Sequence, residues 1–392
     1  MIDQQLAELS NLAIVVTIVL YVLALIGFGA DLASSSQRRS DARLAAQERK
    51  EAQERERSPA SVGASGAEAE GATAAGDTAV AAGPGAESAV GAGSAGSGAN
   101  GSDALAPGAT GTGTAGTGTA GEAPAASGGM SAQRFAFLLA SAATVLHLIG
   151  VISRALATQR VPWANMYEFA TTSTAIVMVA FLAFSVRRTE LRALGTFVVG
   201  PVLLVLLLAQ TFWIVPAAEL TPSLQNSHWI YIHIGVAIMA TALSILGAVV
   251  ASMQLLQAKH ERVLAERAAT EEFPEHWGRF GHVLDRLPSS STLEALSFRI
   301  HSVAFVCWTF TLIFGAIWAR EAWGRFWGWD PKEVWTFIIW VIYAAYLHAR
   351  ATGGFRGSRA AGLALAGFVA VVFNYTIVNT VINGLHSYSG LG

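Results

Sequence analysis

Eight long apolar runs alternate with polar segments along the 392 residues of the chain. Each run is long enough to cross a hydrocarbon core of about 30 Å as an α-helix. The pattern therefore predicts an all-α fold, a polytopic membrane helical bundle of about eight transmembrane helices. The predicted helices span residues 12–32, 134–157, 166–186, 193–214, 229–255, 299–320, 333–350 and 360–382, with approximate edges.

Basic residues are spread unevenly over the segments between these runs. If the N-terminus lies outside, 20 of the 25 Lys and Arg residues fall on the inner side. Cytoplasmic loops of membrane proteins carry this excess, so we expect an N-out/C-out orientation. Residues 1–11 carry no Lys or Arg, and basic residues follow the first run. We therefore expect that run to be a retained helix instead of a cleaved signal.

Composition divides the chain into three parts. Residues 1–32 form the first transmembrane helix, and residues 33–133 form a cytoplasmic segment. Within this segment, 37–57 is charged and could form a short helix. The stretch 58–132 is almost only Gly, Ala, Ser and Thr, and it is predicted to be disordered because nothing in it can bury a core. Residues 134–392 form a seven-helix domain.

The cysteine content excludes several kinds of chemistry within this chain. With one cysteine, Cys307, the chain cannot form an internal disulfide, a CxxC redox pair or a C-x-x-C-H haem attachment motif. Cys307 lies in an apolar run and is predicted to be a small buried side chain.

Tryptophan is concentrated around an extracytoplasmic loop, 318–335. Six of the eleven Trp residues lie between positions 318 and 340. An aromatic belt at the membrane surface is one explanation. The close alternation of Trp, Gly, Asp and Glu before a helix start favours an aromatic floor for a planar ligand. The candidate ligand-binding residues are Trp323, Trp327, Trp329, Asp330, Trp335 and, at the start of the fifth run, Trp229.

Two acidic residues of this loop have a structural explanation. Asp330, Pro331 and Glu333 are spaced as an N-cap, a first helical residue and the third residue of a capping box. Asn165 and Glu168 are spaced as a second helix cap. We therefore expect capping to be the main role of Asp330 and Glu333.

His233 and His386 are predicted to lie near the Trp-rich loop on the outer side. Two neutral imidazoles beside flat aromatic walls are what axial ligation of haem iron requires. Zinc is a rival, but no Cys or carboxylate pair completes a tetrahedral set. His228 competes with His233 for the same role.

His348 defines a second candidate site. It lies fifteen residues beyond Glu333, about 22 Å along a helix axis, too far to share an iron with His233. A histidine inside the membrane suggests function, although a snorkelling side chain is equally compatible with the pattern. Its opposite ligand would be His147 or a residue of a partner protein.

Further polar residues could complete the outer site. Lys332 or Arg325 could pair with haem propionates, as cations do with carboxylates. Asn side chains are costly in lipid, so those along the eighth run are expected to face other helices or a cavity. These are Asn374, Asn379 and Asn383.

The run Trp-Gly-x-x-Trp-x-Trp-Asp-x-Lys-Glu-x-Trp at 323–335 resembles the tryptophan-rich signature of haem-handling proteins of cytochrome c maturation. Further motifs resemble those of the CcsA/ResC type of System II cytochrome c synthase. They are Asn-Met-Tyr-Glu-Phe at 165–169, Trp229 with His233, Tyr-Leu-His-Ala-Arg at 346–350 and Gly-Leu-His-Ser-Tyr at 384–388. The resemblance covers about residues 134–392.

The resemblance implies haem b as substrate and ligand, bound outside by His233 and His386 and within the membrane by His348. It also implies a ResB/CcsB-type membrane partner and transfer of haem outward. The haem vinyl groups would then form thioethers with the Cys-x-x-Cys-His motif of an apocytochrome c. Such a protein would be a multi-pass subunit in the lipid bilayer of a bacterial plasma membrane, with no nucleic-acid partner.

Three other functions remain open from the sequence. The first is a haem transporter without synthase activity, so whether the chain is part of an enzyme is undecided. The second is a b-type membrane cytochrome that carries electrons between two haems. The third is a structural membrane subunit with an aromatic belt, which predicts no haem at all.

Overall fold

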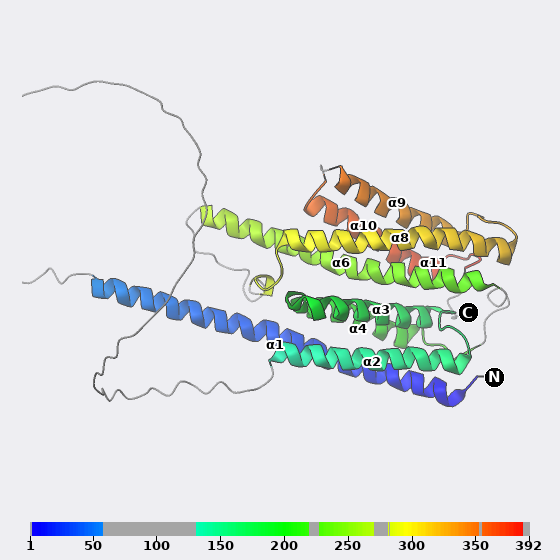
Figure 1. Ribbon diagram of the computed structural model, residues 1–392, viewed down its shortest axis with the longest axis horizontal. Coiled ribbons are helices and arrows are strands. Elements are labelled where there is room, and N and C mark those ends of the chain that lie inside the picture. The colour runs from blue at the N-terminus through cyan, green and yellow to red at the C-terminus, as the bar shows by residue number, and fades with distance from the viewer. Residues whose placement is uncertain are drawn as a thin grey trace, which may run out of the picture. The chain divides into compact units, whose positions relative to one another are not determined.

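The computed structural model describes residues 2–57, 131–218, 227–269, 281, 283–352 and 355–386 (Figure 1). The linker predicted to be disordered, 58–132, lies outside the described residues except for its last two, and so do His276 and His282. The described part contains helices and no strand. Its elements are α1 (Gln4–Arg57), α2 (Ala132–Thr158), α3 (Met166–Arg187), the 3₁₀ helix η1 (Thr189–Leu194), α4 (Gly195–Phe212), α6 (His228–Ala269), α8 (Ser290–Trp323), α9 (Pro331–Ala351), α10 (Ser358–Tyr375) and α11 (Ile377–Thr380).

Eight helical segments of the described chain are long and apolar enough to cross a membrane. This confirms the predicted all-α bundle of about eight spans. Several helices differ in length from the prediction. α1 continues without a break to Arg57, and α6 continues to Ala269. Both extensions are rich in Ala, Glu, Gln, Lys and Arg, which favour helix, so the helices run on past their apolar stretches.

Helix α6 lies at the centre of the bundle and packs along α8 (Figure 1). One hydrophobic core joins α6 to α1–α4 and includes Tyr21, Met178 and Leu246. A second core joins α6 to α8, α9 and α10 and includes Trp308 and Tyr343. The helices that carry the Trp-rich loop are therefore fixed against α6 from one side.

Helix α1 packs against α2 within the bundle. Ser10 Oγ donates a hydrogen bond to the Gly150 carbonyl at 2.7 Å, and the Tyr21 hydroxyl lies 3.1 Å from Thr144 Oγ1. A Cβ atom at Gly150 would lie 2.9 Å from Ile14 Cδ1, so glycine allows this close approach. These buried contacts place α1 beside α2.

A buried ion cluster fixes the segment between α2 and α3. Glu168 is fully buried and accepts hydrogen bonds from Arg154 Nε at 3.1 Å and from Arg160 Nη1 at 2.8 Å. Arg154 also donates to the Val215 carbonyl at 2.8 Å, which ties the end of α4 to the same cluster. The Asn165 side chain accepts from the Glu168 backbone N–H, confirming the predicted cap. Together these contacts position the start of α3.

Candidate functional site: a pocket with two histidines

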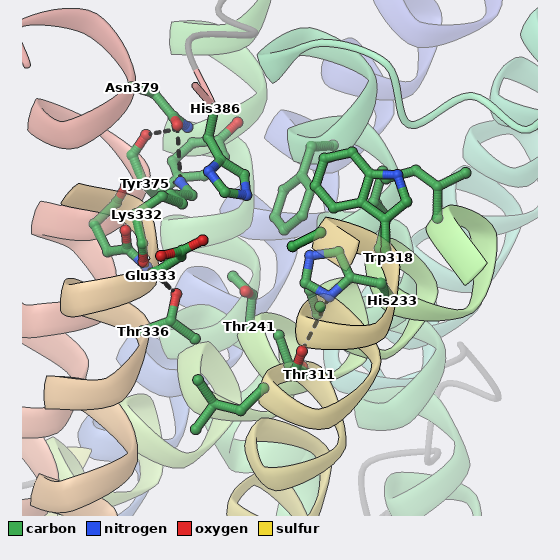
Figure 2. Close-up of a pocket in the computed structure, with 18 of the residues that line it drawn as sticks. His233, Thr241, Thr311, Trp318, Lys332, Glu333, Thr336, Tyr375, Asn379 and His386 are labelled. Carbon is green, nitrogen blue, oxygen red and sulfur yellow. Dashed lines mark hydrogen bonds between the residues drawn. The ribbon is translucent and has the colours of Figure 1, made fainter. Parts of the chain in front are cut away.

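A pocket lies between α6, α8, α9, α10 and α11, beside the start of α3 (Figure 2). It encloses about 1180 Å³ of space, part of which is open solvent. The apolar part of its wall includes Trp163, Met166, Phe169, Ile234, Trp308, Leu312, Trp318 and Trp327.

His233 reaches the pocket from the second turn of α6. Its Nδ1 lies 3.0 Å from the carbonyl oxygen of Thr311, to which it donates. A Cβ atom at Gly315 would lie 2.8 Å from His233 Cε1, so this glycine makes room for the ring. Trp318 stacks beside the imidazole, with ring centroids 6.0 Å apart and planes 9° from parallel. With Nδ1 protonated, Nε2 carries the lone pair that a metal needs.

His386 reaches the same pocket from the segment after α11. Its Nδ1 donates to Asp330 Oδ2 at 2.8 Å, which again leaves the lone pair on Nε2. The edges of Trp318 and Trp323 contact this imidazole, with ring centroids 5.7 Å and 4.9 Å away. The structure thus brings the two predicted histidines to one pocket, and both lie beside the Trp318 ring.

Asp330 has two roles in the structure. It forms the predicted capping box with Glu333 at the start of α9. Its carboxylate also accepts hydrogen bonds from His386 and from the backbone N–H of Leu385. Burial by itself raises the pKa of Asp330, but the bonds from His386, Leu385 and Lys332 outweigh it and lower the pKa below its ordinary value. The contact with His386 could not be inferred from the sequence, because the two residues lie far apart in the chain.

The polar part of the pocket is formed by α9, α10 and α11. Lys332 Nζ donates to the Asn374 carbonyl at 2.9 Å and to Asn379 Oδ1 at 2.8 Å. The Tyr375 hydroxyl donates to the Met166 carbonyl at 2.6 Å, which closes the wall against α3. Asn374 and Asn379 therefore face a cavity, as predicted. Asn383 is exposed and does not line the pocket.

Two of the predicted tryptophans belong to the pocket or its support. Trp327 lines the pocket, and Trp323 packs against Trp318 and His386 behind its wall. The rings of Trp318, Trp323 and His386 contact one another edge to face, and Trp327 and Trp329 do the same. These side chains therefore do not form the flat aromatic surface that the sequence predicted. Helix α8 continues to Trp323, where Gly324 ends it in the left-handed conformation at φ 74°. The loop before α9 is therefore shorter than the predicted 318–335.

Three other predicted ligand-binding tryptophans lie outside the pocket wall. Trp229 stacks on Phe314 at 5.9 Å, and Trp335 packs on Phe373 at 4.1 Å between ring centroids. Trp329 is 75% exposed and has a positive φ of 58°. The sequence pattern did not single out Trp163, Trp308 and Trp318 as wall residues. Of these, Trp318 had a usable signal, since it belongs to the cluster of six tryptophans between positions 318 and 340.

The other candidate histidines lie apart from the pocket. His228 is exposed at the start of α6. His348 is exposed on α9, on the face that carries the exposed Phe337 and Val341. His147 is fully buried on α2, with Nδ1 3.4 Å from the Tyr21 hydroxyl. Because α9 packs against α8 and α10 while α2 packs against α1 and α3, the structure does not bring His147 and His348 together.

The donor set of the pocket suits iron in a planar macrocycle better than a bare metal ion. Within the described ranges, no group of three or more His, Cys, Asp or Glu side chains could hold a metal ion. A structural zinc site needs four such donors. Two imidazoles with fixed tautomers beside an apolar wall match the axial ligation of haem.

The fold and the site thus define a polytopic helical membrane protein with a paired-histidine pocket at one end of the bundle. Residues 135–386 match the family described as cytochrome C assembly protein, which is more than half of the chain. The chain belongs to this family and is of its CcsA type, a cytochrome c biogenesis protein of the membrane that works in cytochrome c maturation. The predicted family is confirmed, and membership implies that the protein handles haem.

The relatives are curated proteins named cytochrome c biogenesis protein CcsA. One from Heterosigma akashiwo is 32% identical over 250 residues, covering 59% of this chain and 77% of the relative. One from Gloeobacter violaceus is 32% identical over 295 residues, covering 64% and 86%. One from Chlamydomonas reinhardtii is 37% identical over 172 residues, covering 44% and 43%.

Proposed function

We propose that this pocket binds haem b as the substrate of cytochrome c synthesis, with His233 and His386 as axial ligands of its iron. The observation that carries the proposal is that two histidines far apart in the chain, one on α6 and one after α11, face one largely apolar pocket. Each holds its Nδ1 in a hydrogen bond, to Thr311 or to Asp330. Such bonds set the orientation and tautomer of histidine ligands and raise their basicity.

The role of the protein in this reaction is to position haem for attack by the thiols of the apocytochrome. In thioether formation, the S–H bond of an apocytochrome cysteine adds across a haem vinyl group, so one C–S and one C–H bond form and no electrons are gained or lost. The substrate supplies the nucleophile in its Cys-x-x-Cys-His motif. The protein supplies iron ligands and a shielded wall, which fix the macrocycle while the thiols approach.

A second haem site at His348 fits the outward transfer of haem. This side chain is exposed on α9 and points away from the core. His147 is buried beside Tyr21, so the opposite ligand would come from another chain. We propose a ResB/CcsB-type membrane protein in that role. The chain would work in a bacterial plasma membrane, with the His233 pocket on the extracytoplasmic face.

Alanine substitution of the two pocket histidines tests the proposal. His233→Ala and His386→Ala should each abolish holocytochrome c, because an imidazole ligand is lost, while the protein remains in the membrane. Holocytochrome c is measured by haem staining of cell extracts, and membrane insertion by immunoblot of membrane fractions. His228→Ala is the matched control, since His228 is exposed outside the pocket, and it should behave as wild type. Normal holocytochrome c in both pocket variants would exclude the axial-ligand role.

A further inference from the structure

Lys332 is a basic side chain in the pocket wall, and its Nζ has no acidic partner among the residues that the structure describes. Its Nζ donates to two neutral oxygens, Asn374 O at 2.9 Å and Asn379 Oδ1 at 2.8 Å. No carboxylate in the described ranges lies within ion-pair distance of Nζ. A lysine ammonium has three N–H donors, so one remains for a ligand. Figure 2 shows this side chain beside the space that His233 and His386 face.

The neighbouring acids, Asp330 and Glu333, accept hydrogen bonds from groups other than Lys332 Nζ. Asp330 accepts from His386, from the Leu385 N–H and from the backbone N–H of Lys332. One oxygen of Glu333, Oε2, accepts from the backbone N–H groups of Gly328 and Asp330. Both carboxylates therefore hold the loop, and neither lies within ion-pair distance of Lys332 Nζ. The second oxygen of Glu333, Oε1, is buried without a hydrogen-bond partner among the described residues. A charged group in a largely apolar wall is costly unless it is paired, so the site favours an anionic group on its ligand.

Arg325 is the other cation that the sequence proposed for this role, and its position differs. Its guanidinium lies directly over Gly328, where a Cβ atom would overlap Nη1. Arg325 does not line the pocket, whereas Lys332 does. The structure thus favours Lys332 over Arg325 as the cation that meets a ligand.

We propose that Lys332 binds one carboxylate group of the pocket's ligand. This deepens the proposed function and rests on it: for haem, the carboxylate is a propionate. Propionates and vinyl groups lie on opposite edges of the macrocycle, so an ion pair with Lys332 turns the vinyl edge away from α9. Glu333 adjoins the same place, and its charge disfavours a second carboxylate there. Lys332 is thus a substrate-orienting residue, while His233 and His386 hold the iron.

Esterification of the ligand tests this pairing without changing the protein. The full-length wild-type chain in lipid nanodiscs is titrated with haem b and with haem b dimethyl ester, and binding is followed by absorbance. The diacid should bind about 10- to 100-fold more tightly, as expected for one charge-assisted hydrogen bond. Equal affinity for the two ligands would overturn the proposal, and this measurement does not depend on how any variant folds.

The variants Lys332→Met and Arg325→Met show which cation causes the preference for haem b over its dimethyl ester. Lys332→Met should bind haem b about 10- to 100-fold more weakly and bind the diester as wild type does, so the discrimination disappears. Arg325→Met should keep the wild-type discrimination. Discrimination that persists in Lys332→Met, or is lost in Arg325→Met alone, would also overturn the proposal.

Iron-free protoporphyrin IX separates this proposal from the proposed function, because it has the two carboxylates but no iron. Its preference over its dimethyl ester should match that of haem in wild type and vanish in Lys332→Met. If His233→Ala leaves haem binding unchanged while this preference persists, the axial-ligand assignment fails and the carboxylate site stands. If haem binding depends on His233, but haem b and protoporphyrin IX each bind with the same affinity as their dimethyl esters, the proposed role of Lys332 is wrong. The axial-ligand assignment then stands.

Discussion

At the scale of single residues, the pocket depends on hydrogen bonds that hold two imidazole rings. The Thr311 carbonyl fixes His233, and the Asp330 carboxylate fixes His386. The hydrogen bond from His386 to the Asp330 carboxylate is the stronger of the two, because a charged acceptor makes a hydrogen bond roughly twice as strong as a neutral one. Asp330 also caps α9, so a single side chain links the position of His386 to the start of the helix that carries Lys332.

Replacing Asp330 by Asn should loosen His386 while keeping much of the helix cap. Asn is as good an N-cap as Asp, but it cannot offer a charged acceptor to Nδ1. Haem affinity should fall by roughly 10- to 100-fold, the usual effect of losing an outer partner of a metal ligand. Titration of the purified variant with haem measures this. Wild-type affinity would contradict a role of Asp330 beyond capping, and Glu190→Gln, at an exposed ion pair, is the control.

The lowered pKa of Asp330 sets the direction of a pH effect. A carboxyl group whose pKa is lower when folded adds stability above its unfolded pKa and loses it as the pH falls through the folded value. Its ordinary value is 3.8. The contribution of the Asp330 carboxylate should therefore be fully present above pH 3.8 and should decline as the pH falls below it, in thermal unfolding of wild type compared with Asp330→Asn. A difference between the two proteins that stays unchanged as the pH falls well below 3.8 would contradict this.

At the scale of secondary-structure elements, the start of α3 is held by buried charge. Glu168 bonds to Arg154 on α2 and to Arg160 in the connection, and both arginines donate to carbonyls after α4, those of Val215 and Ala218. The pocket-wall residues Trp163 to Met166 lie between Arg160 and Glu168 in the chain. The hydrogen bonds of Arg160 and Glu168 therefore position one side of the pocket. The sequence predicted the cap at Asn165, but not this cluster.

Glu168→Gln should destabilise the bundle strongly. It leaves Arg154 and Arg160 buried without a counter-charge, and removing one partner of a buried pair costs about 3–5 kcal/mol. The thermal unfolding temperature of the protein in detergent should fall well below that of wild type. Glu190→Gln, at the exposed pair with Arg188, should change stability by less than about 1 kcal/mol. Equal effects of the two substitutions would show that burial of the Glu168 cluster contributes nothing.

At the scale of the whole molecule, two candidate haem positions lie at different places in the bundle. The His233 pocket is enclosed by α6, α8, α9, α10 and the start of α3. His348 is farther along α9 and exposed. The second iron ligand of a haem bound there would come from a second protein. This arrangement would give a path for haem along α9, from His348 to the pocket.

Spectra of the complex purified with its membrane partner test for two sites. Wild type should contain two haem populations, and His233→Ala and His348→Ala should each lose a different one. A single population, lost equally in both variants, would exclude the path. Supplying haem and a Cys-x-x-Cys-His peptide to the reduced complex then separates attachment from transport, because a transporter without synthase activity forms no thioether product.

The sequence by itself determined the number of apolar helices and the two helix caps, and it predicted that His233 and His386 lie near each other beside the Trp-rich loop. These features follow from local properties: hydropathy over about twenty residues, cap spacing, and motifs that occur intact in the chain. Only the tertiary structure showed that Asp330 holds His386, that Trp318 adjoins both imidazoles, and that Lys332 instead of Arg325 lines the pocket. These contacts join residues far apart in the chain, or depend on which side of a turn a side chain takes. Side-chain packing between helices decides them, and the one-dimensional pattern does not record it.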